Sequence, residues 1–112
     1  MLAKKFRIAK QKEVEAVFKR GQSSFDNIIG IKRLKNNKDI NRFVVVVSTK
    51  VSKKAVERNK IKRRISEICR VHYKEFGKGS DFFILALPAI INKKYQEIDS
   101  SILKHLKKLK NK

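Results

Sequence analysis

The chain has 112 residues with 30 Lys or Arg against 10 Asp or Glu, so its formal net charge is +20. This length suits one compact domain, and a hydrophobic content of 41% with seven Phe argues against a disordered polycation. No apolar run approaches the ~20 residues of a membrane span, and the N-terminus lacks the apolar block of a signal peptide. We therefore expect a cytoplasmic protein with no membrane partner.

The excess of positive charge predicts a polyanionic partner, because a folded domain tolerates such self-repulsion when its partner carries the opposite charge. Nucleic acid is favoured, since cations release condensed counterions from phosphates. A lysine-rich surface that only aids solubility is a weaker explanation, and a membrane surface is weaker still.

The first expected elements are an extended basic segment over residues 1 to 9 and a helix over residues 10 to 21. In this helix Val14, Val17 and Phe18 recur at i, i+3 and i+4, which places them on one side. This periodicity alone favours a core position for Phe18.

Strands are expected next, over residues 25 to 34 and 42 to 49, with an extra strand near residues 22 to 30. Alternation along the first strand predicts two faces: Ile29, Ile31 and Arg33 on one, and Gly30, Lys32 and Leu34 on the other. Residues 35 to 41 have the composition of a hairpin loop. The unbroken valines of 42 to 49 predict a central strand, covered at least in part on both faces.

A loop over Lys50 to Lys54 and a helix from about Ala55 to Glu75 follow. The apolar stripe of this helix comprises Ile61, Ile65, Ile68, Cys69 and His72. The opposite face carries Asn59, Arg63, Ser66 and Arg70, flanked by Lys60 and Lys62. A lone cysteine on the apolar side is expected to be a small buried hydrophobe rather than a reactive thiol.

The remaining elements are a turn over 76 to 80, a buried strand over 81 to 87 that Pro88 stops, and a C-terminal helix. The helix places Ile98, Ile102, Leu106 and Leu109 on one face, and Lys104 to Lys112 is expected to be a frayed basic tail. The sequence thus predicts one α+β domain over residues 1–112, a mixed sheet with helices packed on it, in the order α-β-β-β-α-β-α.

Catalytic chemistry is not apparent in the sequence. His72 and His105 lie on separate helices without other metal ligands at suitable spacing, and Glu13 and Glu15 are expected to be solvated. No nucleophile has an evident base, so we assign no catalytic residue and no metal site to this chain.

The stretch from Lys50 to Arg70 instead predicts RNA binding, because it holds nine basic residues and only two acidic ones, Glu57 and Glu67. Most charge runs are solvated helix faces, but here pairing at i, i+4 cannot neutralise the cations. Arginines can fork onto phosphate oxygens, and the face carries no aromatic, so it suits backbone and shape recognition of folded RNA.

The stretch "STKVSKKAVERNKIKRRISE" also resembles the signature of the bacterial ribonuclease P protein component, K-x-x-x-x-A-V-x-R-N-x-x-K-R-x-x-R-E. The matching positions are Lys50, Ala55, Val56, Arg58, Asn59, Lys62, Arg63 and Glu67. The early "FRIAKQKEVEAVFKRG" is similar to the family's opening R-L and V-F-K-x-G helix, and the length, basicity and element order fit over nearly the whole chain.

The resemblance implies the protein subunit of ribonuclease P, an endoribonuclease in which the RNA subunit, using magnesium, removes the 5′ leader of precursor tRNA. The protein, a monomer within the holoenzyme, would bind that RNA and the leader without cleaving. The residues implied to dock the RNA subunit are Lys50, Lys53, Lys54, Arg58, Asn59, Lys60, Lys62, Arg63 and Arg70. The residues implied to line the leader cleft are Arg7, Val14, Phe18, Gly30 and Lys32. A left-handed β-α-β crossover is also implied by the resemblance alone.

The chain departs from the family pattern at four places. Lys60 replaces an Arg and loses its fork, Ser66 replaces a later Arg, and Lys53-Lys54 replace a Gly-Asn pair. Val14 and Lys32 stand where aromatic residues are expected, which favours phosphate contact over stacking in the cleft. A small basic ribosomal protein is the alternative to this assignment, and a stand-alone nuclease is a third class.

Overall fold

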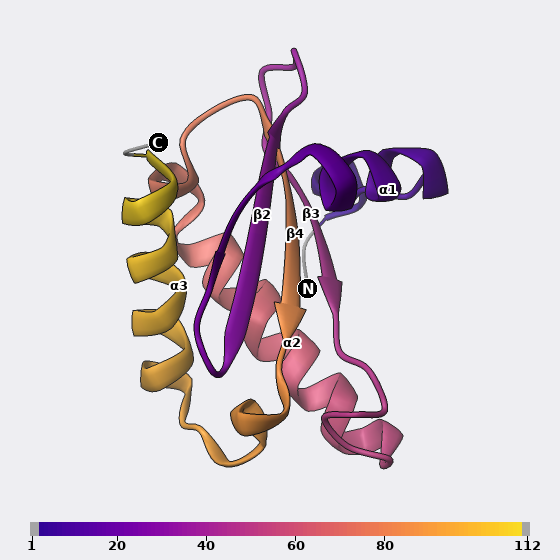
Figure 1. The fold of residues 1–112 in the computed structure, drawn as a ribbon, viewed down its shortest axis with the longest axis vertical. Coiled ribbons are helices and arrows are strands. Elements are labelled where there is room, and N and C mark those ends of the chain that lie inside the picture. Colours follow the sequence, from indigo (N-terminus) through magenta and orange to yellow (C-terminus); the bar gives the residue numbers. More distant parts are fainter. Residues whose placement is uncertain (1–2, 111–112) are drawn as a thin grey trace.

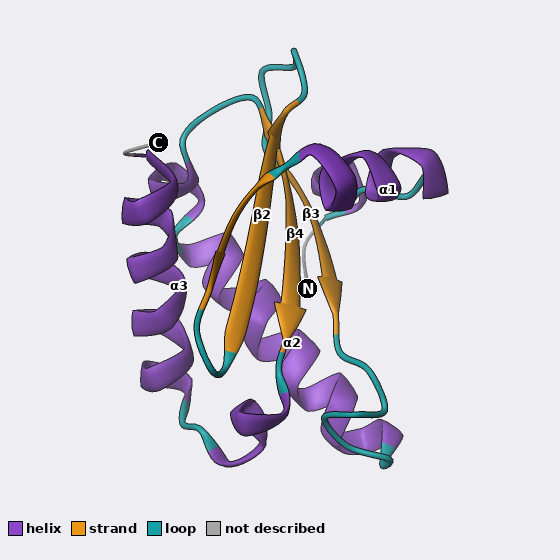
Figure 2. Ribbon diagram, viewed as in Figure 1, coloured by secondary structure: helices purple, strands orange, loops and turns teal. Residues whose placement is uncertain are grey.

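The computed structural model describes residues 3–110 as a four-stranded sheet, in the order β1-β2-β4-β3, with helices on both faces. In Figure 1, α1 crosses in front of the upper part of the sheet and α2 runs behind it. The helices are α1 (Gln11–Arg20), α2 (Ala55–Val71) and α3 (Tyr95–Lys110). The strands are β1 (Gln22–Phe25), β2 (Ile29–Lys35), β3 (Arg42–Val46) and β4 (Ser80–Ala86). This arrangement confirms the α+β class, the element order and the extra short strand (Figure 2).

One face of the sheet, which we call the covered face, packs against α2 and α3. Alternate strand residues such as Ile31, Phe43 and Phe82 meet Ile65 of α2 and Ile102 of α3 in one core, and none of these five is more than 1% exposed. The apolar stripes predicted for both helices are confirmed except at His72, which follows the last residue of α2 and is half-buried. Cys69 is fully buried, where desolvation raises the pKa of its thiol.

The opposite face, which we call the open face, carries only α1. A smaller cluster forms where Val17 and the N-terminal Ile8 pack on Phe83. The prediction that the valine strand is central was wrong, because β3 is an edge strand in which only alternate residues are buried. Its remaining valines, Val44 and Val46, are partly exposed on the open face.

The prediction of a hairpin between β2 and β3 was also wrong, because β4 lies between them, antiparallel to β2 and parallel to β3. Asn41, at the end of the connecting loop, is fully buried. Its side chain donates to the Gly77 carbonyl (2.7 Å) and accepts from the Ser80 amide (3.1 Å). The β3-α2-β4 connection is therefore a crossover, and its left-handedness stays a prediction.

Two 3-10 turns, one before α1 and one after α2, alter the expected element boundaries. Residues Lys4–Phe6 form a 3-10 turn, and an isolated bridge then joins Arg7 to Phe43 of β3. The helix expected to reach Glu75 ends at Val71, and a 3-10 turn over Tyr73–Phe76 leads to Gly77, whose φ of 84° favours glycine.

The C-terminal residues are more ordered than expected. The tail predicted to fray stays helical to Lys110, because Leu106 and Leu109 are buried against the covered face, while its last two residues lie outside the described range. Within residues 3–110, no helix is long and apolar enough to cross a membrane.

Candidate nucleic-acid interface

The first candidate surface is the basic face of α2, a name we use for Lys53, Lys54, Asn59, Lys60, Lys62 and Arg63, all exposed. The exposed Lys50 precedes it in the loop. In the described chain, no ion pair joins any of these cations to a carboxylate. The Arg63 guanidinium makes only a long bond to the Asn59 carbonyl, at 3.4 Å. The face therefore presents positive charge that a polyanion can neutralise.

The start of α2 is organised by side chains where the family's Gly-Asn pair is absent. The Ser52 hydroxyl donates to the Glu57 carboxylate (2.7 Å) and accepts from the Lys54 amide (3.1 Å). Arg58 is half-buried and donates from Nη1 to the Ser52 carbonyl at 3.0 Å. Arg58 thus braces the loop that presents Lys53, while its other donors stay available.

Two residues expected on the basic face behave differently. Arg70 is exposed but forms a forked ion pair with Glu67, which lowers the pKa of that carboxyl and offsets the charge of the arginine. Ser66 was predicted to lie opposite the apolar stripe, but it is only 5% exposed. Its position in α2 turns it toward the edge of β3, where it lines a hollow with Val45.

The second candidate surface is the part of the open face that α1 leaves uncovered. We call it the open strip and define it by Phe18, Phe25, Lys32, Val46 and Leu85. Phe18 comes from α1 and the other residues from β1, β2, β4 and β3, so apolar groups and one cation lie together on this side of the sheet.

Phe18 lies at the α1 end of the open strip and is 48% exposed, whereas its helix neighbour Val17 is fully buried. The structure thus places Phe18 at the surface, contrary to its periodicity. Its ring meets Phe83 edge-to-face, with centroids 5.4 Å apart. Val14 is partly buried beside this contact.

Lys32 covers the Phe18 ring. Its Nζ lies 4.1 Å from the ring centroid and donates to the Phe18 carbonyl at 2.7 Å. Lys32 thus occupies one face of the Phe18 ring, so the two residues form one cationic-aromatic unit.

Phe25 was missed by the sequence reasoning, and it supplies an aromatic surface farther along the strip. It is 48% exposed, and a Cβ on Gly30 would lie 2.2, 2.4 and 2.9 Å from three consecutive atoms of its ring. Such distances indicate that a ring face lies flat on the glycine. Gly30 is therefore buried beneath the Phe25 ring, and its assignment to the leader cleft stays a prediction. The alternation of β1 opposite β2, with Phe25 paired to Gly30, was the signal that could have found it.

An ion cluster fixes α1 on the sheet. Arg42 of β3 donates to Glu13 of α1 (Nη2 to Oε2, 2.8 Å) and to Asp81 of β4 (Nε to Oδ1, 2.9 Å). These bonds raise the pKa of Arg42, and the bond from Arg42 lowers the pKa of Glu13. The expectation that Glu13 is solvated was therefore wrong, because its carboxylate faces a mostly buried guanidinium.

Arg7, assigned to the leader cleft by resemblance, lies at a different place from Phe18. It is exposed beside the edge of β3 and lines a hollow of about 190 Å³ together with Lys62 of the basic face. The structure thus brings together one residue from each expected RNA site.

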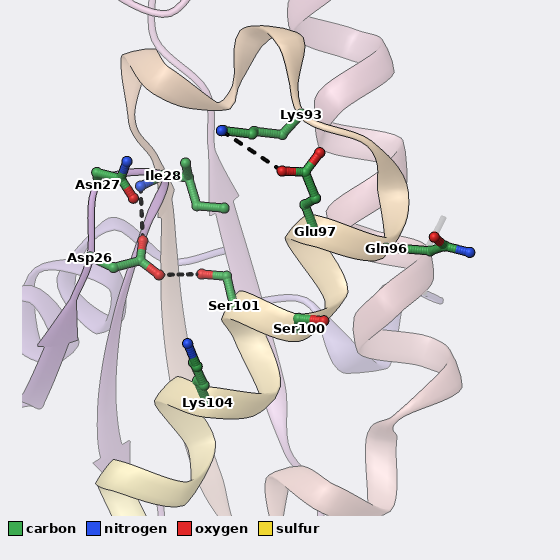
Figure 3. A pocket seen from close by; sticks show the side chains of 9 residues that line it. All are labelled: Asp26, Asn27, Ile28, Lys93, Gln96, Glu97, Ser100, Ser101 and Lys104. Carbon is green, nitrogen blue, oxygen red and sulfur yellow. Dashed lines mark hydrogen bonds and ion pairs between the residues drawn. The ribbon is translucent and has the colours of Figure 1, made fainter.

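A separate hollow, of about 430 Å³, lies between the β1–β2 turn and α3 (Figure 3). Asp26 there accepts the Ile28 and Ile29 amides, both at 2.8 Å, and the Ser101 hydroxyl at 2.5 Å. These bonds outweigh burial and lower the pKa of Asp26. The Asp26 carboxylate is thus occupied in holding the turn to α3.

His105 lies behind the same turn and completes a serine-histidine-aspartate arrangement. Its Nδ1 is 2.6 Å from the Ser24 hydroxyl and its Nε2 is 3.2 Å from Asp26. Ser24 and His105 are 8% and 1% exposed, so a substrate cannot reach the hydroxyl, and burial lowers the pKa of His105. His72 is half-buried and lies 2.9 Å from Asp99. Within residues 3–110, no three His, Cys, Asp or Glu are grouped to hold a metal ion.

Comparison with known proteins gives a consistent result. Residues 2–110 match the family described as Ribonuclease P. The chain is 40% identical to the ribonuclease P protein component of Clostridium kluyveri over 105 residues, covering 92% of this chain and 93% of the relative. It is 32% identical to that of Finegoldia magna over 109 residues, covering 97% and 95%.

Solved structures show the same architecture. The Staphylococcus aureus RNase P protein superposes with a TM-score of 0.82 at 29% identity, covering 91% of this chain and 93% of that one. A Staphylococcus aureus mutant with defective mRNA degradation activity superposes with a TM-score of 0.87 at 30% identity, covering 96% and 90%. The Thermotoga maritima protein gives 0.80 at 25% identity, covering 88% and 92%.

Proposed function

This chain belongs to the ribonuclease P protein family and is a subunit of that tRNA-processing holoenzyme, and on this premise we propose how it divides its RNA contacts between two surfaces. The basic face of α2 docks the catalytic RNA, and the open strip holds the 5′ leader of precursor tRNA. The observation that carries the proposal is the exposed, uncompensated position of the signature residues Asn59, Lys62 and Arg63 on one helix side.

The contribution of the basic face is electrostatic. Each cation that meets a phosphate releases counterions and strengthens binding in a salt-dependent way. Lys60 contributes charge without the fork of an arginine, Arg58 contributes from its braced position, and Arg70 contributes less because Glu67 shares its guanidinium.

The open strip suits a single strand, because it combines half-exposed aromatic rings with a cation. At the α1 end, Lys32 contacts a leader phosphate and Phe18 supports the lysine from below. In the neighbouring row of the sheet, Phe25 offers its free side to a base, and the apolar Leu85 and Val46 continue that row across β4 and β3. Phosphate contact and stacking are thus separated along the strip.

The chemistry of cleavage belongs to the RNA subunit, which uses magnesium. This chain lowers the magnesium requirement, because its cations neutralise phosphates that would otherwise need metal ions. Among the described residues the Ser24–His105–Asp26 arrangement is the nearest to a nucleophile with a base, and its burial favours a structural role.

Two other functions remain as outcomes of the test. One is binding of ribosomal RNA, which a small basic α+β protein also suits. The other is RNA cleavage by the protein alone, because a mutant of the Staphylococcus aureus RNase P protein is described as defective in mRNA degradation activity.

The experiment is reconstitution with a bacterial ribonuclease P RNA, following leader removal from precursor tRNA at low magnesium. We expect cleavage at the mature 5′ end with both subunits, little cleavage by RNA alone at that magnesium concentration, and intact substrate with protein alone. Failure of the protein to rescue the RNA would contradict the assignment. Cleavage by RNA-free protein that is lost in a Ser24→Ala control would show that this chain itself catalyses cleavage.

A further inference from the structure

The hollow that Arg7 and Lys62 share, which we call the edge notch, is not explained by either proposed surface alone. It has a volume of about 190 Å³ and lies where the N-terminal segment, β3 and α2 meet. Ile8 and Val44 border it from the open face, and Ser66 borders it from α2. The notch therefore wraps around the sheet edge, between the open strip and the basic face.

The side chains of the notch offer donors without internal partners. Within residues 3–110, neither Arg7 nor Lys62 forms an ion pair or a side-chain hydrogen bond, and no carboxylate lines the notch. Ser66 is 5% exposed, and in the described chain its hydroxyl also has no hydrogen-bond partner. A ligand oxygen that enters the notch can accept a hydrogen bond from this hydroxyl.

The sheet edge adds backbone donors. Beside the notch, the N-terminal segment pairs with β3 at Phe43, whose carbonyl accepts the Ile8 amide at 2.9 Å. Backbone groups of a strand alternate in direction, so Val45, two residues beyond Phe43, also directs its backbone outward along this edge. Since β3 is the last strand of the sheet, no further strand takes up that position.

From these observations we propose that the edge notch is a binding site for one phosphate group of an RNA backbone. A guanidinium, an ammonium, a hydroxyl and a strand-edge amide together match a tetrahedral dianion or phosphodiester. This inference rests on the proposed function only for the RNA that supplies the phosphate, which is either the leader or the catalytic RNA. In both cases the notch joins the open strip and the basic face into one continuous RNA-binding surface.

The first test uses the isolated protein and inorganic phosphate at constant ionic strength, monitored by backbone amide chemical shifts. We expect a saturable shift at Val45 and Ser66 that Arg7→Gln weakens severalfold. Lys12→Gln, which removes an exposed cation of α1, is the matched control and leaves the shift unchanged. Shifts that spread over surface lysines and spare Val45 and Ser66 would overturn the proposal.

The second test is a double-variant cycle in the reconstituted holoenzyme. If Arg7 and Lys62 hold one phosphate, Arg7→Gln and Lys62→Gln together should weaken binding less than the product of their separate effects. Arg7→Gln with Lys12→Gln should be multiplicative within about twofold, as for independent sites. A multiplicative result for both pairs, with a working holoenzyme, would reject the notch and leave the proposed function intact.

The source of the phosphate follows from the same variants. With a leader phosphate, the coupling between Arg7 and Lys62 disappears once the leader is shortened past one defined nucleotide. With a phosphate of the catalytic RNA, the coupling is present in RNA-subunit binding without any substrate. Coupling in neither measurement would contradict the site, even if the isolated protein binds inorganic phosphate.

Discussion

The two faces of the sheet carry similar apolar residues but differ in how many helices cover them. The covered face presents Ile31, Phe43 and Phe82 to two helices and is sealed, whereas the open face presents Phe83, Val46 and Leu85 and is covered by α1 alone. Apolar content therefore does not identify the core of this protein; the number of helices on each face does. An apolar sheet surface that is left uncovered, and rimmed by cations, is free to bind a partner.

The largest effect should come from removing an aromatic ring on the covered face. Phe82 is fully buried and packs on Phe43 and Phe76, so Phe82→Ala should lower the free energy of unfolding by about 3–5 kcal/mol. Phe25→Ala on the open face should cost about 1 kcal/mol, because half of that residue is already exposed. Denaturant unfolding of both variants measures the contrast, and equal losses would mean that the open face is part of the core.

The next effect concerns the ion cluster that seats α1 on the open face. Arg42→Ala leaves Asp81, 7% exposed in its side chain, without its cation and should cost about 3 kcal/mol. Glu13→Gln removes the more exposed carboxylate, 34% exposed, and should cost about 1 kcal/mol or less. Thermal melts of the two variants make the comparison. If Glu13→Gln lowered the melting temperature more than Arg42→Ala, the ion cluster would matter more for holding α1 than for joining β3 to β4.

A smaller effect on stability, with a clear effect on function, is expected at Phe18. Phe18→Ala removes the support beneath Lys32 and should reduce the preference of the holoenzyme for precursor over mature tRNA by about 0.5–1 kcal/mol. Its melting temperature should change little, whereas Val17→Ala, at a fully buried position, should lower the melting temperature and spare the preference. A Phe18→Ala protein that melts far below the parent, yet prefers precursor tRNA as strongly as the parent does, would show that Phe18 is a core residue.

The smallest effect is a pH dependence that originates on the covered face. Burial lowers the pKa of His105 below its ordinary 6.5, so the unfolded chain binds the proton more readily than the folded one. Stability should therefore fall as the pH drops below about 6.5, by up to about 1.4 kcal/mol for each unit of the shift. The facing charges are Asp26, which opposes the shift, and Lys108, which adds to it. Unfolding measured from pH 7.5 to 5.5 should show this slope in the parent and a flatter one in His105→Gln.

Sequence reasoning succeeded where a residue type serves a single role. The stripe from Ile98 to Leu109 and the stripe from Ile61 to Cys69 were predicted because helical periodicity and burial coincide there. It failed at the valines of β3. Apolar residues occur both on a sheet face that packs in the core and on a sheet face that is left open to bind a ligand, so the valines alone do not distinguish the two. The hairpin failed for another reason: nothing local indicates that β4, from residue 80 onward, inserts between β2 and β3.

The candidate sites divide in the same way. The charged residues of the basic face were predicted because charge density is read directly from the sequence, and all of them are exposed. Phe25 and the Arg42 cluster were missed, because each depends on a partner distant in sequence or on strand pairing. Ser66 was misplaced, since a simple helical wheel does not include the edge of β3 beside α2.

The most direct test of the division between faces is a methyl chemical-shift comparison in the reconstituted holoenzyme, with mature and with precursor tRNA. Val46 and Leu85 report the open face, and Ile102 and Leu106 report the covered face. We predict that adding the leader shifts the Val46 and Leu85 methyls and leaves those of Ile102 and Leu106 in place. Leader-dependent shifts at Ile102 and Leu106, with none at Val46 and Leu85, would contradict the account.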